Sequence, residues 1–198
     1  FRVARAVELE RVRTRIATDL HDDIGSSLSR IAILTELLQR KVDPSAKPLT
    51  GTLGRIAGLS RELVDSMSDI VWAIDPKRDN LDNLVFRMRR FASDALTASN
   101  IDFTFRAPTG ERSLALGPNL RRELYLVFKE SINNAIKHSG CERVEIDLST
   151  EGGRLTLVVR DDGGGFDPAE AADGHGLASL AHRAERLGGR LRIDSAVS

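Results

Sequence analysis

The chain has a single cysteine among its 198 residues, Cys141, and few aromatic residues, 5% of the total. One cysteine cannot form an internal disulfide bond, which fits a reducing compartment such as the cytosol. No apolar run approaches the roughly 20 residues that a membrane-spanning helix needs, and no signal peptide is present. Because the sequence starts inside a helical pattern, we expect a fragment, and the missing span says little about the full protein.

A net charge is also lacking, since 29 Lys and Arg residues balance 29 Asp and Glu residues. No overall field would therefore draw the chain to nucleic acid or to an acidic membrane surface. The hydrophobic content of 41%, in a chain long enough for one large or two small domains, predicts a globular protein with a substantial core.

The first 40 residues lack proline and have glycine only at Gly25, which predicts one long helix over 1–40. Prolines and glycine then predict a connection over 42–51, followed by a second helix to about residue 74. Both helices repeat apolar residues every seven positions, as packed helical bundles do. The rows are Ala17, Ile24, Ile31 and Leu38 with Leu20, Ser27 and Leu34, and then Leu53, Ser60, Met67 and Ile74 with Ile56, Leu63 and Ile70.

A hairpin with two such stripes cannot bury both by itself. A second copy would complete a four-helix bundle, so we expect a homodimer through residues 13–74. The alternative is that the hairpin packs on its own downstream domain. The strict period of about 3.5 residues favours the dimer, because it is typical of supercoiled helices.

One histidine lies on the flank of this predicted seam. His21 directly follows the seam residue Leu20 and precedes Asp22, and Gly25 one turn later is expected to clear space above it. An exposed imidazole on a rigid backbone can act as a nucleophile. Taken alone, however, such a histidine is usually an ordinary solvated residue.

The pattern changes after a third predicted helix, over about 81–95. Near residue 100 the apolar period shifts from 3.6 to 2, and helices and strands mix from there on. We expect strands near 101–105, 142–149, 154–160 and 190–193, and helices over 118–138 and 177–187. This predicts two domains, 1–78 and 79–198, the second an α/β sandwich of helices on a mainly antiparallel sheet.

Three clusters in the second domain contain side chains or backbone groups that are suited to binding a ligand. Glu130, Asn134, Lys137 and His138 follow one another at helical spacing, and carboxylate and amide oxygens suit Mg²⁺. Asp161 to Gly165 follow a strand, where glycines allow a flat ligand to approach and an acid can accept hydrogen bonds from an amine such as that of adenine. Gly174, His175, Gly176 and Leu177 lead into a helix, whose free amides can hold phosphate oxygens. Each cluster alone could be an ordinary solvated face, turn or helix start, but the three in this order are far more specific.

These residues resemble the core of a two-component sensor histidine kinase of the NarL- or DesK-like subfamily. Its phosphoacceptor segment, Leu-His-Asp-x-x-Gly, matches residues 20–25. The second domain is similar to GHKL (Bergerat) ATPases. The stretch from Glu130 to His138 corresponds to the N box, Asp161 to Gly165 to the G1 box, and Gly174 to Leu177 to the G2 box.

The resemblance implies ATP and Mg²⁺ as cofactors and a role for each residue. Asn134 would bind Mg²⁺ with Glu130 beside it, and Asp161 would receive the adenine amine in a loop opened by Gly163 and Gly165. Phosphates would lie against Lys137, His138 and the stretch Gly174, His175, Gly176 and Leu177. His21 would accept the phosphoryl group while Asp22 holds the proton on its other nitrogen.

Three departures from the family pattern stand out. Ser26 replaces a glutamine that relatives with phosphatase activity carry, which leaves that activity open. Asp162 stands where many kinases have asparagine. The final strand with a Gly-Thr pair, expected after Ile193, falls beyond the sequence.

By resemblance, then, the chain is expected to autophosphorylate His21 and pass the phosphoryl group to an aspartate of a response regulator. From its charge balance, the chain itself is not expected to bind nucleic acid directly. The regulator would carry a LuxR-type output domain, and the chain would be the cytoplasmic portion of a membrane-anchored bacterial sensor. Two alternatives are a degenerate dimeric scaffold and a GHKL protein-serine kinase of the anti-sigma type. The intact residues argue against the first, and the histidine hairpin argues against the second.

Overall fold

The computed structural model describes residues 12, 16, 20–42, 47–75, 79–108, 115–166 and 175–196, without the side chains of 21–23, 47–48 and 175–176. The chain divides into two compact units, Phe1–Arg78 and Asp79–Ser198. Within the described residues, no helix is both long enough and apolar enough to cross a bilayer.

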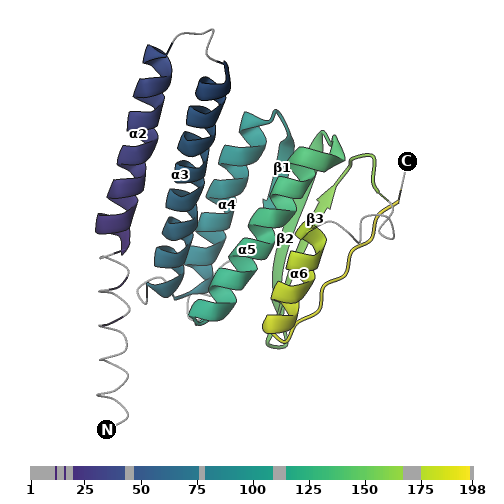
Figure 1. The fold of residues 1–198 in the computed structure, drawn as a ribbon. Coiled ribbons are helices and arrows are strands. Elements are labelled where there is room, and N and C mark those ends of the chain that lie inside the picture. The colour runs from purple at the N-terminus through teal and green to yellow at the C-terminus, as the bar shows by residue number, and fades with distance from the viewer. Residues whose placement is uncertain are drawn as a thin grey trace. The chain divides into compact units, whose positions relative to one another are not determined.

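The first unit is a helical hairpin (Figure 1). A π-helical turn, η1 (Leu20–Gly25), leads into α2 (Ser26–Lys41), and α3 (Lys47–Ile74) returns beside it. The predicted connection over 42–51 is too long, because α3 already begins at Lys47 and includes Pro48 and Gly51 in its first turns. Proline is tolerated there, since the first amides of a helix have no partner within it. The predicted uniform helix over 1–40 is also wrong at residues 20–25, where the π turn replaces regular α-helix.

Mostly small side chains, with Met67, form the contact between α2 and α3. Ala32 and Thr35 are buried on α2, opposite buried Ala57, Ser60 and Met67 on α3. The hydroxyl of Thr35 donates to the Ile31 carbonyl at 2.7 Å, so this buried polar group is satisfied within its own helix. Small residues allow two helix backbones to approach closely.

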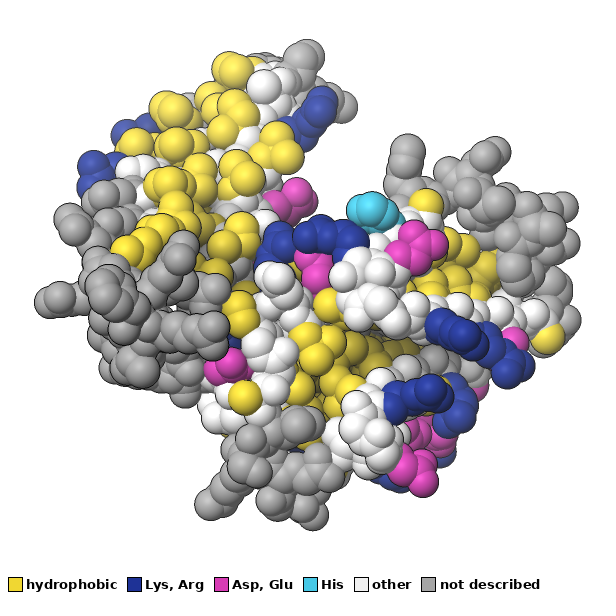
Figure 2. Space-filling model, turned by 90° about the horizontal axis from the view of Figure 1, so that it is seen from below, with side chains coloured by type: hydrophobic (Ala, Val, Ile, Leu, Met, Phe, Trp, Pro, Cys, Tyr) yellow, Lys and Arg dark blue, Asp and Glu magenta, His cyan; other side chains and the backbone are white. Residues whose placement is uncertain are grey.

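The larger apolar side chains of the hairpin point elsewhere. The predicted seam residues of α2 lie on its exposed face in the single chain, so the prediction that a second copy covers them stays open. Figure 2 shows hydrophobic side chains gathered over one face of the hairpin. The members of this exposed apolar row are Ile24, Ile31, Leu34, Leu38, Ile56 and Leu63, each at least 40% exposed.

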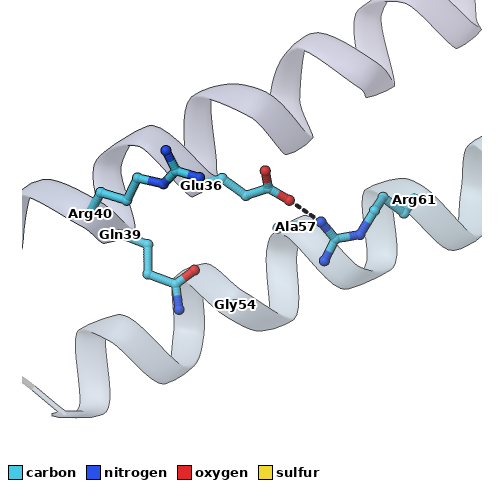
Figure 3. A pocket seen from close by; sticks show the side chains of 6 residues that line it. All are labelled: Glu36, Gln39, Arg40, Gly54, Ala57 and Arg61. Atoms are coloured by element: carbon cyan, nitrogen blue, oxygen red, sulfur yellow. Dashed lines mark hydrogen bonds and ion pairs between the residues drawn. The ribbon is translucent and has the colours of Figure 1, made fainter.

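Polar contacts hold the hairpin at the end away from η1. Glu36 of α2 pairs with Arg61 of α3, and the Gln39 side chain donates to the Thr50 carbonyl at 3.3 Å. Figure 3 shows these helices bordering a pocket of about 310 Å³. Its lining residues are Glu36, Gln39, Arg40, Gly54, Ala57 and Arg61. Since this pocket lies several turns along α2 from residue 21, it is not part of the phosphoacceptor segment.

The second unit begins with a well-capped helix, α4 (Leu81–Ala98), followed by β1 (Asp102–Arg106). The Asn80 side chain accepts a hydrogen bond from the Asn83 amide at 2.8 Å, which caps α4. Asp79 accepts a hydrogen bond from the Gly117 amide at 2.8 Å and lies 3.8 Å from the buried guanidinium of Arg121. The first residue of this unit is thereby tied to the start of α5 (Pro118–Asn134).

The sheet is mixed rather than mainly antiparallel. Its order is β1-β2-β3, with β2 (Arg143–Glu151) parallel to β1 and antiparallel to β3 (Arg154–Asp161). A two-residue turn joins β2 to β3, and Gly152 and Gly153 have φ of 56° and 78°, as a tight hairpin turn requires. The alternating burial of β2 shows that one face of the sheet is covered.

Helices α4, α5 and α6 (His175–Arg186) lie over that face (Figure 1). Phe128 of α5 is fully buried and meets Phe91 of α4 and Phe105 of β1 edge to face, with ring centroids 6.1 and 6.2 Å apart. Burying one such side chain contributes about 1.5–3 kcal/mol. This core fixes α5 on the sheet, and α5 carries the first of the predicted nucleotide-binding clusters.

The predicted last strand over 190–193 is wrong, because residues 189–196 form no regular element. Leu191 and Ile193 are 36% and 37% exposed, so the alternation of this segment is not matched by a buried face. A strand also needs a neighbour with free hydrogen-bonding groups, and no described strand pairs with this segment.

Candidate functional site

The end of α5 and the end of β3 meet at one point. Helix α5 continues into a π turn, η3 (Ala135–Ser139), which stops at Gly140 in the left-handed conformation, with φ of 64°. The Gly164 amide donates to the Ser139 carbonyl at 3.0 Å. A Cβ on Gly163 would lie 2.6 Å from the Ser139 Cβ and closer still to its carbonyl oxygen. Only glycine fits there, and its small size brings the residues after β3 against the end of the helix.

Asp162 holds this junction from the other side. Its carboxylate accepts hydrogen bonds from the amides of Glu142 and Arg143, each at 2.9 Å, and so joins the end of β3 to the start of β2. The hydrogen bond from the Arg143 amide is the largest cause that lowers the pKa of Asp162 below its ordinary value of 3.8. The aspartate at position 162 therefore has a structural role in this chain, which is to join β3 to β2.

Asp161 occupies the exposed end of β3. One of its carboxylate oxygens accepts a hydrogen bond from the Gly163 amide at 3.1 Å, which turns the chain away from the strand. Gly165 follows with φ of 69°, a conformation that favours glycine. The carboxylate is thus held at the mouth of the loop, where a ligand amine could reach it.

Glu130 and Asn134 lie one turn apart on α5, and both are half-buried. Their carboxylate and amide oxygens are the hard ligands that Mg²⁺ prefers, and Mg²⁺ commonly keeps several waters with few protein ligands. No group of three or more His, Cys, Asp or Glu side chains within the described residues could hold a metal by itself. Glu130 and Asn134 therefore fit a cation whose remaining ligands would be waters and the oxygens of a bound phosphate.

Lys137 and His138 do not continue the helical face as predicted. Both are exposed, and both follow Asn134 within the π turn, where hydrogen bonds close over five residues instead of four. The spacing of three and four residues from Asn134 to Lys137 and His138 therefore no longer places all four side chains in one row.

The third cluster lies at the start of α6. Gly174 lies outside the described residues, while His175, Gly176 and Leu177 form the first turn of this helix. Figure 1 shows α6 running antiparallel to α5, so its first turn is directed toward the end of α5 that bears Asn134. The free amides of this turn can bind anions.

The phosphoacceptor segment forms η1 in the hairpin unit. The backbone of His21 and Asp22 belongs to this π turn, and their side chains lie outside the described residues. Gly25, which was expected to clear space above His21, is buried, and a Cβ on it would lie 2.8 Å from Cε of Met67. The space that Gly25 leaves is therefore used by α3.

Sequence reasoning missed the residues that build the junction from outside the three clusters. Ser139 was not assigned to any of the clusters, and Asp162 was treated only as a departure from a family pattern. A signal was available for Ser139, whose hydroxyl donates to the Ala135 carbonyl at 2.6 Å and accepts from the Cys141 amide at 3.1 Å, as serine often does at helix ends. No local signal indicated Glu123, a buried acid on α5.

Two family profiles match the chain, one for each unit. Residues 12–79 match a family described as histidine kinase, and residues 119–198 match the histidine kinase-, DNA gyrase B-, and HSP90-like ATPases. The ATPase match implies that the second unit binds ATP.

Curated relatives align along nearly the whole chain. UhpB of Salmonella typhimurium, a signal transduction histidine-protein kinase/phosphatase, is 30% identical over 93% of this chain and 36% of its own length. The sensor histidine kinase DesK of Bacillus subtilis is 28% identical over 98% of this chain and 50% of its own length. This chain spans half the length of these relatives or less.

Solved structures show the same fold. The histidine kinase domain of the Erythrobacter litoralis blue-light activated kinase EL346 aligns with a TM-score of 0.54 at 19% identity, covering 87% of this chain and 90% of that domain. The two family matches and the named relatives lead to one assignment. The chain belongs to the family of sensor histidine kinases, in the group of NarL- and DesK-like members.

Proposed function

We propose that this chain is an ATP-dependent protein-histidine kinase that phosphorylates itself on His21. The observation that carries the proposal is the junction at Ser139, where the residues after β3 meet the end of α5. It joins the predicted adenine acceptor Asp161 to the helix that bears Asn134. The nucleotide donor and the histidine acceptor thus belong to two different units of one chain.

In the transfer, a neutral imidazole nitrogen of His21 attacks the γ-phosphorus of ATP. A nitrogen–phosphorus bond forms, the bond from that phosphorus to the bridging oxygen breaks, and ADP leaves with the electron pair. Asp22 accepts a hydrogen bond from the other ring nitrogen, which keeps the attacking nitrogen unprotonated and stabilises the imidazolium that forms.

Asn134 and Glu130 would hold Mg²⁺, which supplies positive charge to the phosphate oxygens. Asp161 receives the adenine amine, and Gly163 and Gly165 let the backbone approach the base. Lys137, His138 and the first turn of α6 from His175 to Leu177, with Gly174 before it, lie toward the phosphates.

The hairpin is proposed to dimerise and to dock the next protein. The exposed apolar row of α2 and α3 supports a homodimer through residues 13–74, because a row this long is buried in a bundle of four helices. The phosphoryl group then passes from His21 to an aspartate of a response regulator with a LuxR-type output domain. The whole protein is proposed to be a bacterial membrane-anchored sensor with this chain in the cytoplasm.

Incubation of the full chain with γ-labelled ATP and Mg²⁺ tests the proposal. Label should appear on the wild type as an acid-labile, alkali-stable phosphoryl group and be absent from His21→Gln. His182→Gln is the matched control, since it removes an exposed histidine of α6 and should leave the label unchanged. Label that survives His21→Gln contradicts the assignment, and acid-stable label would instead indicate a protein-serine kinase.

A further inference from the structure

A buried carboxylate ties helix α6 to helix α5. Glu123 of α5 is only 3% exposed and lies among three guanidinium groups. Arg183 donates to its Oε2 at 2.7 Å, while Arg122 and Arg186 reach its Oε1 at 2.9 and 3.3 Å. Arg183 and Arg186 stand one turn apart in the last turns of α6, so Glu123 binds that end of the helix at two points.

Most of the described side chains of α6 are not buried. Leu180 is its one buried residue within the part of the helix whose side chains are described, at 4% exposure. Hydrogen bonds between guanidinium groups and a carboxylate are directional and roughly twice as strong as hydrogen bonds between neutral groups. The Glu123 cluster therefore sets the position of α6 along α5.

This cluster lies at the opposite end of α6 from the predicted phosphate-binding turn. The two helices run antiparallel (Figure 1), and eight residues separate Arg183 from His175. At the helical rise of 1.5 Å per residue, that is about 12 Å, and the same rise along α5 leads from Glu123 to about Ser131. The first turn of α6 thus reaches the level of α5 that carries Glu130 and Asn134.

We propose that Glu123, through Arg183 and Arg186, is a positioning residue for the ATP phosphates. It touches no nucleotide itself. By holding the far end of α6, it places the first turn of that helix where its amides meet the phosphates, while the adenine contact at Asp161 does not depend on it. The inference rests on the proposed ATP-binding function.

The test compares ATP with adenosine, because only ATP has the phosphates that α6 would bind. Dissociation constants are measured for the full chain in the His21→Gln background, by competition with a fluorescent ATP analogue. In Glu123→Gln the constant for ATP should rise roughly tenfold to a hundredfold, as a displacement of about 1 Å can cause. The constant for adenosine should stay within about twofold of the parent, since Asp161 is untouched.

Asp94→Asn is the matched control. It removes a carboxylate from the exposed pair of Arg90 and Asp94 on α4, in the same unit, and should change neither constant. Arg183→Lys keeps one charged donor and should restore part of the ATP affinity that Arg183→Met loses. If Glu123→Gln fails to fold by circular dichroism, Arg186→Gln replaces it, because the Arg186 side chain is 56% exposed.

Equal weakening of ATP and adenosine in a folded variant would show general damage and overturn the inference. An unchanged ATP constant in Glu123→Gln, or in Arg186→Gln where that variant decides, would also overturn it. If the proposed ATP-binding function itself is wrong, the parent chain should bind neither ATP nor adenosine. That result is distinguishable from the two above, and it would overturn the inference together with the function.

Discussion

Gly163 lies against Ser139 with no room for a side chain, since a Cβ there would come within 2.6 Å of the Ser139 Cβ. The obstacle includes the Ser139 backbone, which is itself held by η3 and by the Gly164 amide. Two segments separated by more than 20 residues in the sequence are therefore fitted to one another at the predicted nucleotide site.

Replacing Gly163 by alanine should separate these segments. We expect a loss of about 1–3 kcal/mol in the free energy of unfolding, because overpacking forces the backbone to shift, together with weaker ATP binding. Gly164→Ala is the control, since its Cβ would meet nothing within 4 Å. Denaturant unfolding and nucleotide titration of both variants check the prediction, which equal behaviour of the two alanines would contradict.

Asp162 should contribute a pH-dependent part of the stability. Its lowered pKa means that the native state favours the carboxylate, so the contribution is present above the ordinary value of 3.8 and is lost as pH falls through the lower native pKa. In Asp162→Asn the amide oxygen can still accept hydrogen bonds, but the charge is gone. Unfolding curves should therefore differ between wild type and variant near neutral pH and converge in acid. A difference that persists at the lowest pH would point to packing instead of charge.

Asn134→Asp should abolish nucleotide-dependent labelling of His21 and leave the dimer intact. The new carboxylate adds negative charge beside Glu130 and the phosphates and removes an amide donor. Asn133→Asp makes the same chemical change at a neighbouring half-buried position on a different side of α5. Labelling assays and sedimentation of both variants give the comparison, and unchanged labelling in Asn134→Asp would remove that residue from the metal site.

Association of the hairpin can be tested with two adjacent residues of similar exposure. Leu34 belongs to the exposed apolar row and is 53% exposed, while Ile33 is 57% exposed on the opposite side of α2. Leu34→Asp should convert the dimer to monomer in analytical ultracentrifugation, because a charge would be buried without a partner. Ile33→Asp should remain dimeric. Dissociation by both variants, or by neither, would argue against this interface.

Local signals in the sequence were sufficient for much of the fold. The apolar period predicted a third helix over about 81–95 and a change to strands near residue 100, and the structure confirms them as α4 and β1. These signals work because the conformation of each depends on a few neighbouring residues. The order of the three clusters then identified the family before any contact was known.

Long-range contacts were beyond such reasoning. The pairing of Glu123 with Arg183 spans 60 residues and has no local pattern. The face of α2 that meets α3 was missed because Ala32 and Thr35 are small or polar. A search for large apolar residues at seven-residue spacing selects Ile31 and Leu34 instead. The strand over 190–193 failed for a related reason, since alternation describes a strand but cannot provide its neighbour.

The narrow contact between α2 and α3 limits the stability of an isolated hairpin. With mostly alanine, serine and threonine beside Met67 between α2 and α3, little apolar area is buried inside one chain, and most of the large side chains remain outside. We therefore expect folding of this unit to be coupled to its proposed association. Its melting temperature should be a function of protein concentration, and no single free energy of folding would describe an isolated copy.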